Sequence, residues 1–301
     1  MPDKCTVIYI MSDVRSGSTL LENILSKTEE TVSVGELALL KTHLLRTGPG
    51  ARWNWNCSCG LPPMACPFWS RVLEGMSVSD SNFNTAVRWN YRSKKMIAGS
   101  LFSSFLKKKF SELNTEKINQ NTIATNIHLY RNIFTITGKK IIVDSSKDPV
   151  QAYLTYLNRP PDFDVKIINL KRDLRAIAAS KSKWSLANNK KKKSLGRWIT
   201  NSLFYKKICL VVTQLANTGD VISLSYEDLV MHTQHQLDEI IKICGLQPYL
   251  APDYMAVEND HTIAGTPQRF SKRPIVYDAS WKTFYEQKPL LSFFGKVMNR
   301  I

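Results

Sequence analysis

The sequence predicts an α/β fold, a three-layer sandwich in which helices cover both faces of a central, mainly parallel sheet. Short apolar runs of β type alternate with stretches of helical periodicity along most of the chain. This alternation is typical of parallel sheets, because two parallel strands are usually joined by a crossover helix. Two of the apolar runs end in loops that suit anions, and the first of these is expected to form a P-loop-like element.

The order of the elements follows from these patterns. Strands are expected at residues 5–11, 31–34, 139–144, 165–170 and 221–225. Helices are expected at residues 19–27, 36–46, 67–75, 83–112, 121–137, 148–157, 174–183, 195–217, 233–244 and 280–287. We expect a single domain over residues 1–301, with a mostly helical insertion at about 45–135 and a covering segment at about 250–290.

The loop after the first strand is the most informative part of the chain. It is built from small residues around one arginine and opens a helical pattern: Arg15, Ser16, Gly17, Ser18, Thr19 and Leu20. Such a strand–loop–helix unit directs backbone N–H groups and a helix N-terminus at one spot, which suits a phosphate. Positions 12 and 18 are both Ser, so the first Gly and the Lys of the ATP-binding loop are missing. The loop favours a 5′-phosphate held by arginine, and an ordinary Ser/Gly-rich turn is the alternative.

A second anion-binding candidate follows the strand expected at 165–170. Arg172 stands at the carboxyl end of that strand, where open α/β sheets bind ligands, and Asp173 is a suitable N-cap for the next helix. Ser180 lies two turns further along this helix, within reach of a group held by Arg172. The two residues suit a ribose 3′-phosphate, or else they are a solvated arginine and a small helix residue.

Five stretches, in order over about residues 5–270, resemble the motifs of one enzyme family. They are residues 15–20, 143–149 with Lys147, 172–180, 225–229 with Tyr226, and 261–270 with Thr266 and Arg269. Together they resemble the sulfotransferases that use 3′-phosphoadenosine-5′-phosphosulfate. Arg15 stands where the cytosolic small-molecule enzymes of animals and plants carry Lys, so the chain is closer to the protein-tyrosine and bacterial carbohydrate or natural-product branches. Thr266 replaces an Asn that is usual in bacterial members.

The resemblance implies a function and roles for particular residues. It implies that loop 15–20 binds the phosphosulfate, that Arg172 and Ser180 bind the 3′-phosphate, and that Tyr226, Thr266 and Arg269 add donor contacts. Arg15 and Lys147 would act on the sulfonate, and Glu36 would be the base, with His261 in reserve. The nucleotide product would be 3′,5′-bisphosphoadenosine. The acceptor would be a hydroxyl or amine of a small natural product or a glycan. The reaction is expected to need no metal ion.

Two other classes of protein remain open, one because of the loop after the first strand and one because of the charge of the chain. The formal net charge is +16, from 41 Lys and Arg against 25 Asp and Glu, which attracts anions in general. A P-loop nucleotide kinase would share the strand–loop–helix unit but needs the missing Lys, and a basic nucleic-acid-binding protein would explain only the charge. We expect no specific nucleic acid, and we interpret Lys190 to Lys193 as a solvated loop.

The sequence also gives expectations about location, and it leaves some questions open. No stretch reaches the roughly 18 apolar residues of a membrane span, and the first strand begins almost at Met1, so we expect a cytoplasmic protein. The oligomeric state, the acceptor and the choice between O- and N-sulfation stay open.

Three cysteines in the aromatic loop 53–69 are ambiguous. Cys57, Cys59 and Cys66, with His43 upstream, contain metal-ligating atoms, but their C-x-C-x6-C spacing is not a common zinc pattern. They either hold a structural metal or only pack. The loop itself is expected to form a lid or acceptor wall, or a surface loop with buried anchors.

Overall fold

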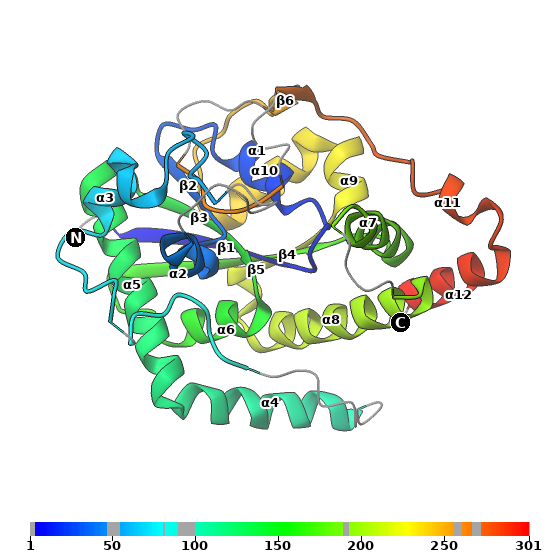
Figure 1. Ribbon diagram of the computed structural model, residues 1–301, viewed down its shortest axis with the longest axis horizontal. Coiled ribbons are helices and arrows are strands. Elements are labelled where there is room, and N and C mark those ends of the chain that lie inside the picture. Colours follow the sequence, from blue (N-terminus) through cyan, green and yellow to red (C-terminus); the bar gives the residue numbers. More distant parts are fainter. Residues whose placement is uncertain are drawn as a thin grey trace.

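Five parallel strands form the centre of the protein. The computed structural model describes residues 4–46, 55–80, 82–89, 100–188, 193–255, 261–266 and 272–300. The strand order is β2-β3-β1-β4-β5, and all neighbouring pairs are parallel (Figure 1). The strands are β1 (Cys5–Ser12), β2 (Thr31–Gly35), β3 (Ile141–Lys147), β4 (Phe163–Lys171) and β5 (Val221–Ser225). The predicted α/β fold and its five strands are confirmed, with small differences at the strand ends.

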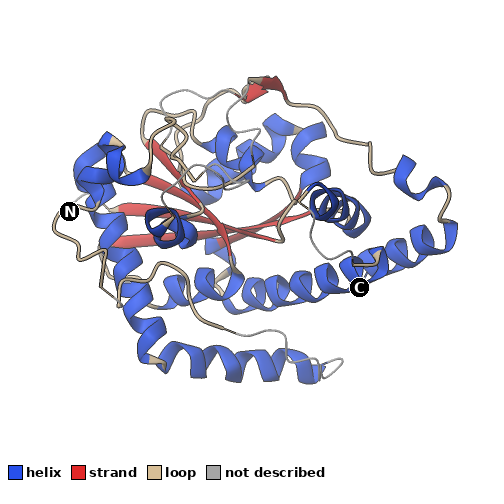
Figure 2. Ribbon diagram, viewed as in Figure 1, coloured by secondary structure: helices blue, strands red, loops and turns tan. Residues whose placement is uncertain are grey.

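Helices cover both faces of this sheet, as Figure 2 shows. One layer contains α1, α9 and α10, and the opposite layer contains α5, α6 and α8. The α-helices are α1 (Ser18–Leu25), α2 (Leu40–Leu45), α3 (Pro67–Val72), α4 (Ser100–Thr115), α5 (Lys117–Thr137), α6 (Pro149–Leu157), α7 (Leu174–Ala187), α8 (Leu195–Leu215), α9 (Tyr226–Met231), α10 (Thr233–Cys244), α11 (Thr283–Glu286) and α12 (Pro289–Arg300). Short 3-10 helices are η1 (Leu37–Leu39), η2 (Pro63–Ala65) and η3 (Thr218–Asp220), and β6 (Tyr254–Met255) pairs antiparallel with β7 (Arg273–Pro274).

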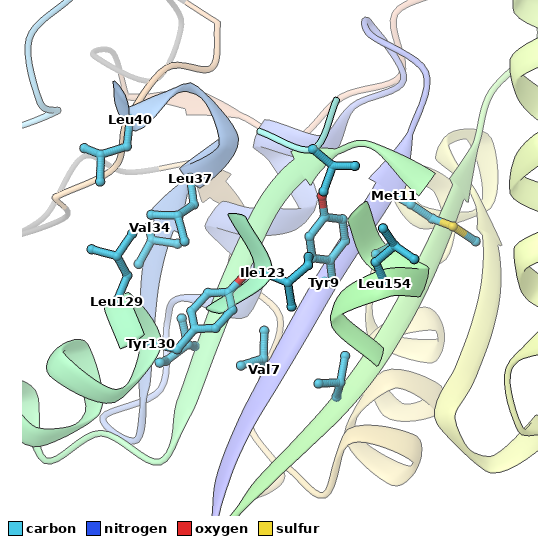
Figure 3. Close-up of a cluster of buried hydrophobic side chains, with 14 of the residues drawn as sticks. Val7, Tyr9, Met11, Val34, Leu37, Leu40, Ile123, Leu129, Tyr130 and Leu154 are labelled. Carbon is cyan, nitrogen blue, oxygen red and sulfur yellow. The ribbon is translucent and has the colours of Figure 1, made fainter. Parts of the chain in front are cut away.

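The alternation along β1 explains the two layers. Successive side chains of a strand point to opposite faces, so Val7, Tyr9 and Met11 join the cluster under α5, α6 and α8 (Figure 3). Ile8 and Ile10 join the other cluster, with α1, α9 and α10. All five side chains are fully buried. Burying an aliphatic or aromatic side chain of this kind contributes about 1.5–3 kcal/mol, so β1 anchors both hydrophobic cores.

The expected helix over 83–112 is wrong in its first part. Residues 83–89 are not helical, α4 begins only at Ser100, and residues 90–99 lie outside the described residues. The backbone N–H of Val87 donates to Gln151 Oε1 over 3.1 Å, and that of Arg88 donates to Asn119 Oδ1 over 2.8 Å. Because these N–H groups bond to side chains of α5 and α6, the segment is held as irregular chain despite its helical pattern. Helices α9 and α12 and the β6–β7 pair were not predicted.

Among the described residues, no helix combines the length and the apolar character that a membrane span requires. The longest helices, α5 and α8, carry polar and basic side chains along their length.

Candidate functional site

Every strand of the sheet ends beside a residue that the sequence singled out. In the order of the sheet, these are Glu36 after β2, Lys147 at the end of β3, Arg15 after β1, Arg172 after β4 and Tyr226 after β5. The register keeps the strand ends level, because Met11 pairs with Lys147 and Ser12 with Leu170. Parallel strands end at one edge, so residues far apart in the sequence gather there. Ligands of open α/β sheets bind at this edge.

The loop between β1 and α1 makes a sharp turn at this edge. Arg15 and Gly17 both have left-handed backbone conformations, with φ angles of 75° and 97°. A Cβ atom at Gly17 would lie 2.5 Å from the Tyr226 ring, so only glycine lets this ring pack against the loop. Gly17 is also the N-cap of α1 and provides no capping side chain. The first N–H groups of α1, which begins with Ser18, Thr19 and Leu20, therefore receive no side-chain cap.

Arg15 and Arg172 meet beside this loop. Together with Ser180 and Tyr226, they form a group that we call the arginine cluster. Arg15 Nε donates to Ser180 Oγ over 2.8 Å, and Arg172 NH1 donates to the backbone oxygen of Arg15 over 3.0 Å. The Arg172 guanidinium stacks on the Tyr226 ring, 4.2 Å from its centroid. Arg15 thus contacts both Arg172 and Ser180, which the sequence predicted to bind one phosphate together.

The positive charge of the arginine cluster is only partly neutralised by nearby carboxylates. Burial lowers the pKa of Arg15, and the nearby charges of Arg172 and Arg273 lower it further. The one ion pair found for Arg172 among the described residues is to Asp278, at 3.4 Å. Three buried polar atoms here have no hydrogen-bond partner among the described residues: Arg172 Nε, Ser12 Oγ and Ser16 Oγ. Buried polar groups are normally paired, so this arrangement suits an anionic ligand.

Glu36 and Lys147 form an ion pair at the ends of the neighbouring strands β2 and β3. Lys147 Nζ lies 2.5 Å from Glu36 Oε1, and the two side chains are 10% and 15% exposed. Glu36 Oε1 also accepts the backbone N–H of Gly265 over 3.0 Å. We refer to these two residues as the Glu36–Lys147 pair. It combines a carboxylate that can accept a proton with a cation that can stabilise negative charge.

A segment near the end of the chain holds Glu36 in place. Segment 261–266 runs beside the end of β2, where Ile263 N donates to Val34 O over 3.0 Å and Glu36 N donates to Ile263 O over 2.8 Å. Gly35 has a φ of 74°, and a Cβ there would lie 2.2 Å from Ile263 O. Glycine before Glu36 is therefore required for this close approach. Thr266, a predicted donor contact, lies in the same segment, and its buried Oγ1 has no partner within the described chain.

A buried aspartate, Asp144, supports the end of β3 that carries Lys147. Asp144 accepts hydrogen bonds from Ser146 N over 2.8 Å and from Tyr130 OH over 2.6 Å. Burial raises the pKa of Asp144 to about 6, although these hydrogen bonds oppose the rise. Lys147 has a φ of 72°, and its carbonyl accepts from Tyr205 OH over 3.1 Å. The Lys147 carbonyl is thus held by Tyr205 and the preceding Ser146 by Asp144, while the Lys147 side chain reaches Glu36.

Sequence reasoning missed several residues that support the site. Lys181 follows Ser180 and forms a largely buried ion pair with Asp13, at 2.5 Å, which ties α7 to the loop after β1. Lys181 also donates to Ser202 Oγ over 3.1 Å. The position of Asp13 inside the loop was a usable signal for this pair. Asp278, the partner of Arg172, had no local signal, because the two residues are 106 positions apart.

Some predicted residues lie elsewhere or cannot be placed. His261, the reserve base, lies against the sulfurs of Cys57 and Cys66. His43, the zinc ligand considered from the sequence, contacts the Trp55 carbonyl at 2.8 Å instead. Arg269 lies outside the described residues, as do residues 190–192 of the lysine run.

Comparisons with known proteins identify the fold. No protein-family model matches the sequence, and no curated protein matches it. Among solved structures, the chain is similar to the sulfotransferase domain of the olefin synthase from Synechococcus PCC 7002. The TM-score is 0.53 at 18% identity, over 93% of this chain and 87% of that one. The chain has the sulfotransferase fold.

A second solved structure supports the same assignment. The sulfotransferase domain from the curacin biosynthetic pathway matches with a TM-score of 0.51 at 15% identity, over 94% of this chain and 90% of that chain. Both matches extend over most of the two chains, so the sulfotransferase fold accounts for the sheet and its covering helices. The resemblance that the sequence motifs indicated is therefore confirmed at the level of fold.

Proposed function

We propose that the chain is a sulfotransferase that moves a sulfonate group from 3′-phosphoadenosine-5′-phosphosulfate to a hydroxyl or amine of a small-molecule natural product or a glycan. The observation that carries this proposal is the arginine cluster beside the loop after β1. Two partly buried arginines meet there at two βα junctions, and Arg172 Nε and Ser16 Oγ have no hydrogen-bond partner among the described residues. A donor with separate 5′ and 3′ phosphates would supply anions to both junctions.

The residues of the loop fit a 5′-phosphosulfate. Arg15 contributes a fixed charge, the start of α1 contributes backbone N–H groups, and Gly17 lets the chain approach closely. Arg172 and Ser180 fit the 3′-phosphate, and Arg15 links them through its contacts with both. Tyr226 supports this arrangement by stacking against Arg172.

The Glu36–Lys147 pair supplies the reactive groups. In the transfer, the acceptor oxygen or nitrogen bonds to sulfur as the sulfur–oxygen bond to the 5′-phosphate breaks, and 3′,5′-bisphosphoadenosine leaves. Lys147 and Arg15 stabilise the negative charge that grows on the sulfonate and leaving oxygens. Glu36 accepts the proton of the acceptor. Because Lys147 neutralises Glu36 in the observed pair, a shift of Lys147 Nζ toward the sulfonate would free the carboxylate for this task.

The thiols of the chain agree with the proposed cytoplasmic location. None of the six cysteines forms a disulfide. Free thiols persist where the compartment is reducing, whereas secreted proteins usually oxidise them to disulfides.

A binding and transfer experiment tests the proposal. Calorimetry should show binding of 3′,5′-bisphosphoadenosine and much weaker binding of ATP and of adenosine 5′-phosphate. Mass spectrometry of an acceptor panel incubated with the sulfonate donor should show a sulfated product. Tight binding of ATP with phosphate transfer would replace the proposal by a kinase. Binding of nucleic acid without affinity for the bisphosphate would replace it by a nucleic-acid-binding protein.

Arg172→Ala and Arg131→Ala form a matched pair for this experiment. Arg131 lies on α5 and forms a half-exposed ion pair with Asp162, which lies just before β4, at the amino end of the sheet. The first variant should lose bisphosphate affinity and the second should keep it. Equal losses would show that the binding is non-specific attraction to a basic protein.

A further inference from the structure

A compact group of metal-ligating side chains lies beside the site, outside the arginine cluster and the Glu36–Lys147 pair. The ligand atoms of Cys57, Cys59, Cys66 and His261 all lie within 4.8 Å of one another. Three of these residues come from the loop 53–69, and the fourth comes from the segment that holds Glu36. Sequence spacing did not reveal this set, because His261 is 195 positions from Cys66.

The distances among Cys57, Cys66 and His261 agree with a tetrahedral metal site, and the Cys59 sulfur lies within 4.8 Å of all three. With Zn–S bonds of about 2.3 Å and Zn–N bonds of about 2.0–2.1 Å, tetrahedral ligands are separated by about 3.8 Å for two sulfurs and about 3.5 Å for sulfur and nitrogen. The Sγ atoms of Cys57 and Cys66 lie 3.7 Å apart. His261 Nδ1 lies 3.7 Å from Cys57 Sγ and 3.2 Å from Cys66 Sγ.

The surrounding residues orient the histidine. The Phe68 ring stacks on the His261 ring, with centroids 5.0 Å apart and an interplanar angle of 6°. Trp69 Nε1 donates to the backbone oxygen of His261 over 2.7 Å. Both aromatic residues belong to α3, directly after Cys66. The stacking restrains the plane of the imidazole ring, and the hydrogen bond restrains the backbone that carries it.

The backbone also ties the two segments together. Ser58 N donates to Thr262 O over 3.1 Å, and Thr262 N donates to Ser58 Oγ over 2.8 Å. Gly60, in a left-handed conformation, closes a turn by donating to Cys57 O over 2.9 Å. These bonds fix the loop that presents Cys57 and Cys59, so the ligand set is held by its own hydrogen bonds.

Disulfide formation and simple packing account for the cluster less well. A disulfide needs sulfurs about 2.05 Å apart, and an odd number of thiols leaves one without a partner. Cys57 and Cys66 are fully buried, but Cys59 is exposed, so apolar packing does not explain why its sulfur joins them. Three thiols with one imidazole are a common ligand set of structural zinc sites.

We propose that Cys57, Cys59, Cys66 and His261 together bind one Zn²⁺ ion as a structural site. All four positions of the tetrahedron are protein ligands, so the ion has no open position for substrate. The expectation that the reaction needs no metal is unaffected. The ion joins residues 57–66 to segment 261–266, whose Gly265 N–H donates to Glu36. The proposal is independent of sulfonate transfer.

Metal analysis of the full chain tests the proposal. Protein produced with added zinc and purified without chelators should contain one zinc per chain by plasma mass spectrometry. X-ray absorption should give three sulfurs at about 2.3 Å and one nitrogen at about 2.0–2.1 Å. Cys66→Ser and His261→Gln should each lower zinc affinity by more than about 100-fold, because even the loss of an outer-shell partner costs 10–100-fold.

Matched variants and a second metal keep the test decisive. Cys244→Ser changes a buried thiol on α10, and His128→Gln changes an exposed histidine on α5; both should keep the full zinc content. If Cys66→Ser does not fold, titration of metal-free wild-type protein with Co²⁺ decides, because tetrahedral thiolate–cobalt sites have intense visible absorption. Wild-type protein without zinc and without this absorption, although its six thiols are reduced, overturns the proposal. Full zinc content in folded Cys66→Ser and His261→Gln overturns it as well.

Discussion

The arginine cluster and the Glu36–Lys147 pair lie at the ends of neighbouring strands. The cluster has an excess of positive charge, whereas the two charges of the pair neutralise each other. In the cluster, Arg15 is held by a hydroxyl and carries a lowered pKa, and Arg172 Nε has no partner among the described residues. In the pair, a carboxylate and an ammonium group neutralise each other at 2.5 Å. The difference indicates a division of labour. The cluster is suited to bind an anion and should determine the affinity for the nucleotide, whereas the pair should determine the rate of transfer.

The largest effect is expected from Glu36→Gln. Glutamine keeps the size of the side chain and an oxygen for the Gly265 N–H, but it cannot take a proton. With a hydroxyl acceptor, the single-turnover rate should fall by about 10²–10⁴, while nucleotide affinity stays close to wild type. A readily deprotonated nitrogen acceptor should show a smaller loss. Glu29→Gln, at an exposed position, is the control, and an unchanged rate in Glu36→Gln would remove the base from the pair.

Lys147→Ala tests the cationic half of the pair. Loss of one charge-stabilising group should lower the single-turnover rate by about a hundredfold or more. Affinity for 3′,5′-bisphosphoadenosine should fall much less, because the sulfonate is absent from the product. Lys166→Ala is a matched control, since Lys166 also lies in a strand and pairs with Asp220 at 2.7 Å. If rapid-quench measurements give wild-type rates for Lys147→Ala, this residue is structural.

Arg172→Ala should give the reverse pattern, a loss of affinity. Removing one partner of a charged hydrogen-bonded pair costs about 2–4 kcal/mol, so calorimetry should show weaker binding of nucleotides with a 3′-phosphate. Nucleotides that lack this phosphate should be affected little. Equal losses for both classes would indicate that Arg172 acts only through its bond to the Arg15 carbonyl, by shaping the loop.

Gly17→Ala should weaken the cluster through geometry alone. The new Cβ would lie 2.5 Å from the Tyr226 ring at a backbone φ of 97°. Strain of this kind costs about 1–3 kcal/mol, so denaturant unfolding should show lower stability and calorimetry lower bisphosphate affinity. Gly219→Ala is the control, because nothing lies within 4 Å of its Cβ position. Equal behaviour of the two variants would mean that the Tyr226 contact does not shape the site.

The last expected effect concerns stability alone: Asp144→Asn, beneath the pair, should change how the free energy of unfolding depends on pH. The pKa of Asp144 is raised from 3.8 to about 6 in the folded state. Between these values the folded chain binds more protons than the unfolded chain, so this group makes stability fall as pH rises. Urea unfolding at several pH values from about 4 to 7 should show this contribution in wild type and not in Asp144→Asn. Parallel pH curves for the two proteins would contradict the assignment.

Local sequence was sufficient for the sheet and for half of the site. Apolar runs of β type located all five strands, and Arg172 was expected at the carboxyl end of its strand, where the structure places it. The geometry of parallel strands makes this prediction possible, since every strand–helix unit ends at the same side. Arg15, Gly17 and Arg172 can therefore be recognised as candidate site residues from the strand and helix patterns next to them.

The pairings across the site were decided by tertiary structure. The partner of Glu36 is 111 positions away at Lys147 (147 − 36), and its second contact, Gly265, is 229 positions away. The irregular course of residues 83–89 depends in the same way on side chains of α5 and α6. A helical period in the sequence does not record which backbone groups a distant side chain will occupy.

By itself, the sequence determined the order of the five central strands along the chain and most of the helices between them, the loop chemistry and the excess of positive charge, because these depend on residues close together in the chain. Only the tertiary structure decided that segment 261–266 lies along β2, which places Gly265 on Glu36 and His261 beside three cysteines. The physical reason is that hydrophobic patterns specify which face of an element is buried, whereas contacts between distant segments depend on how the buried faces fit together.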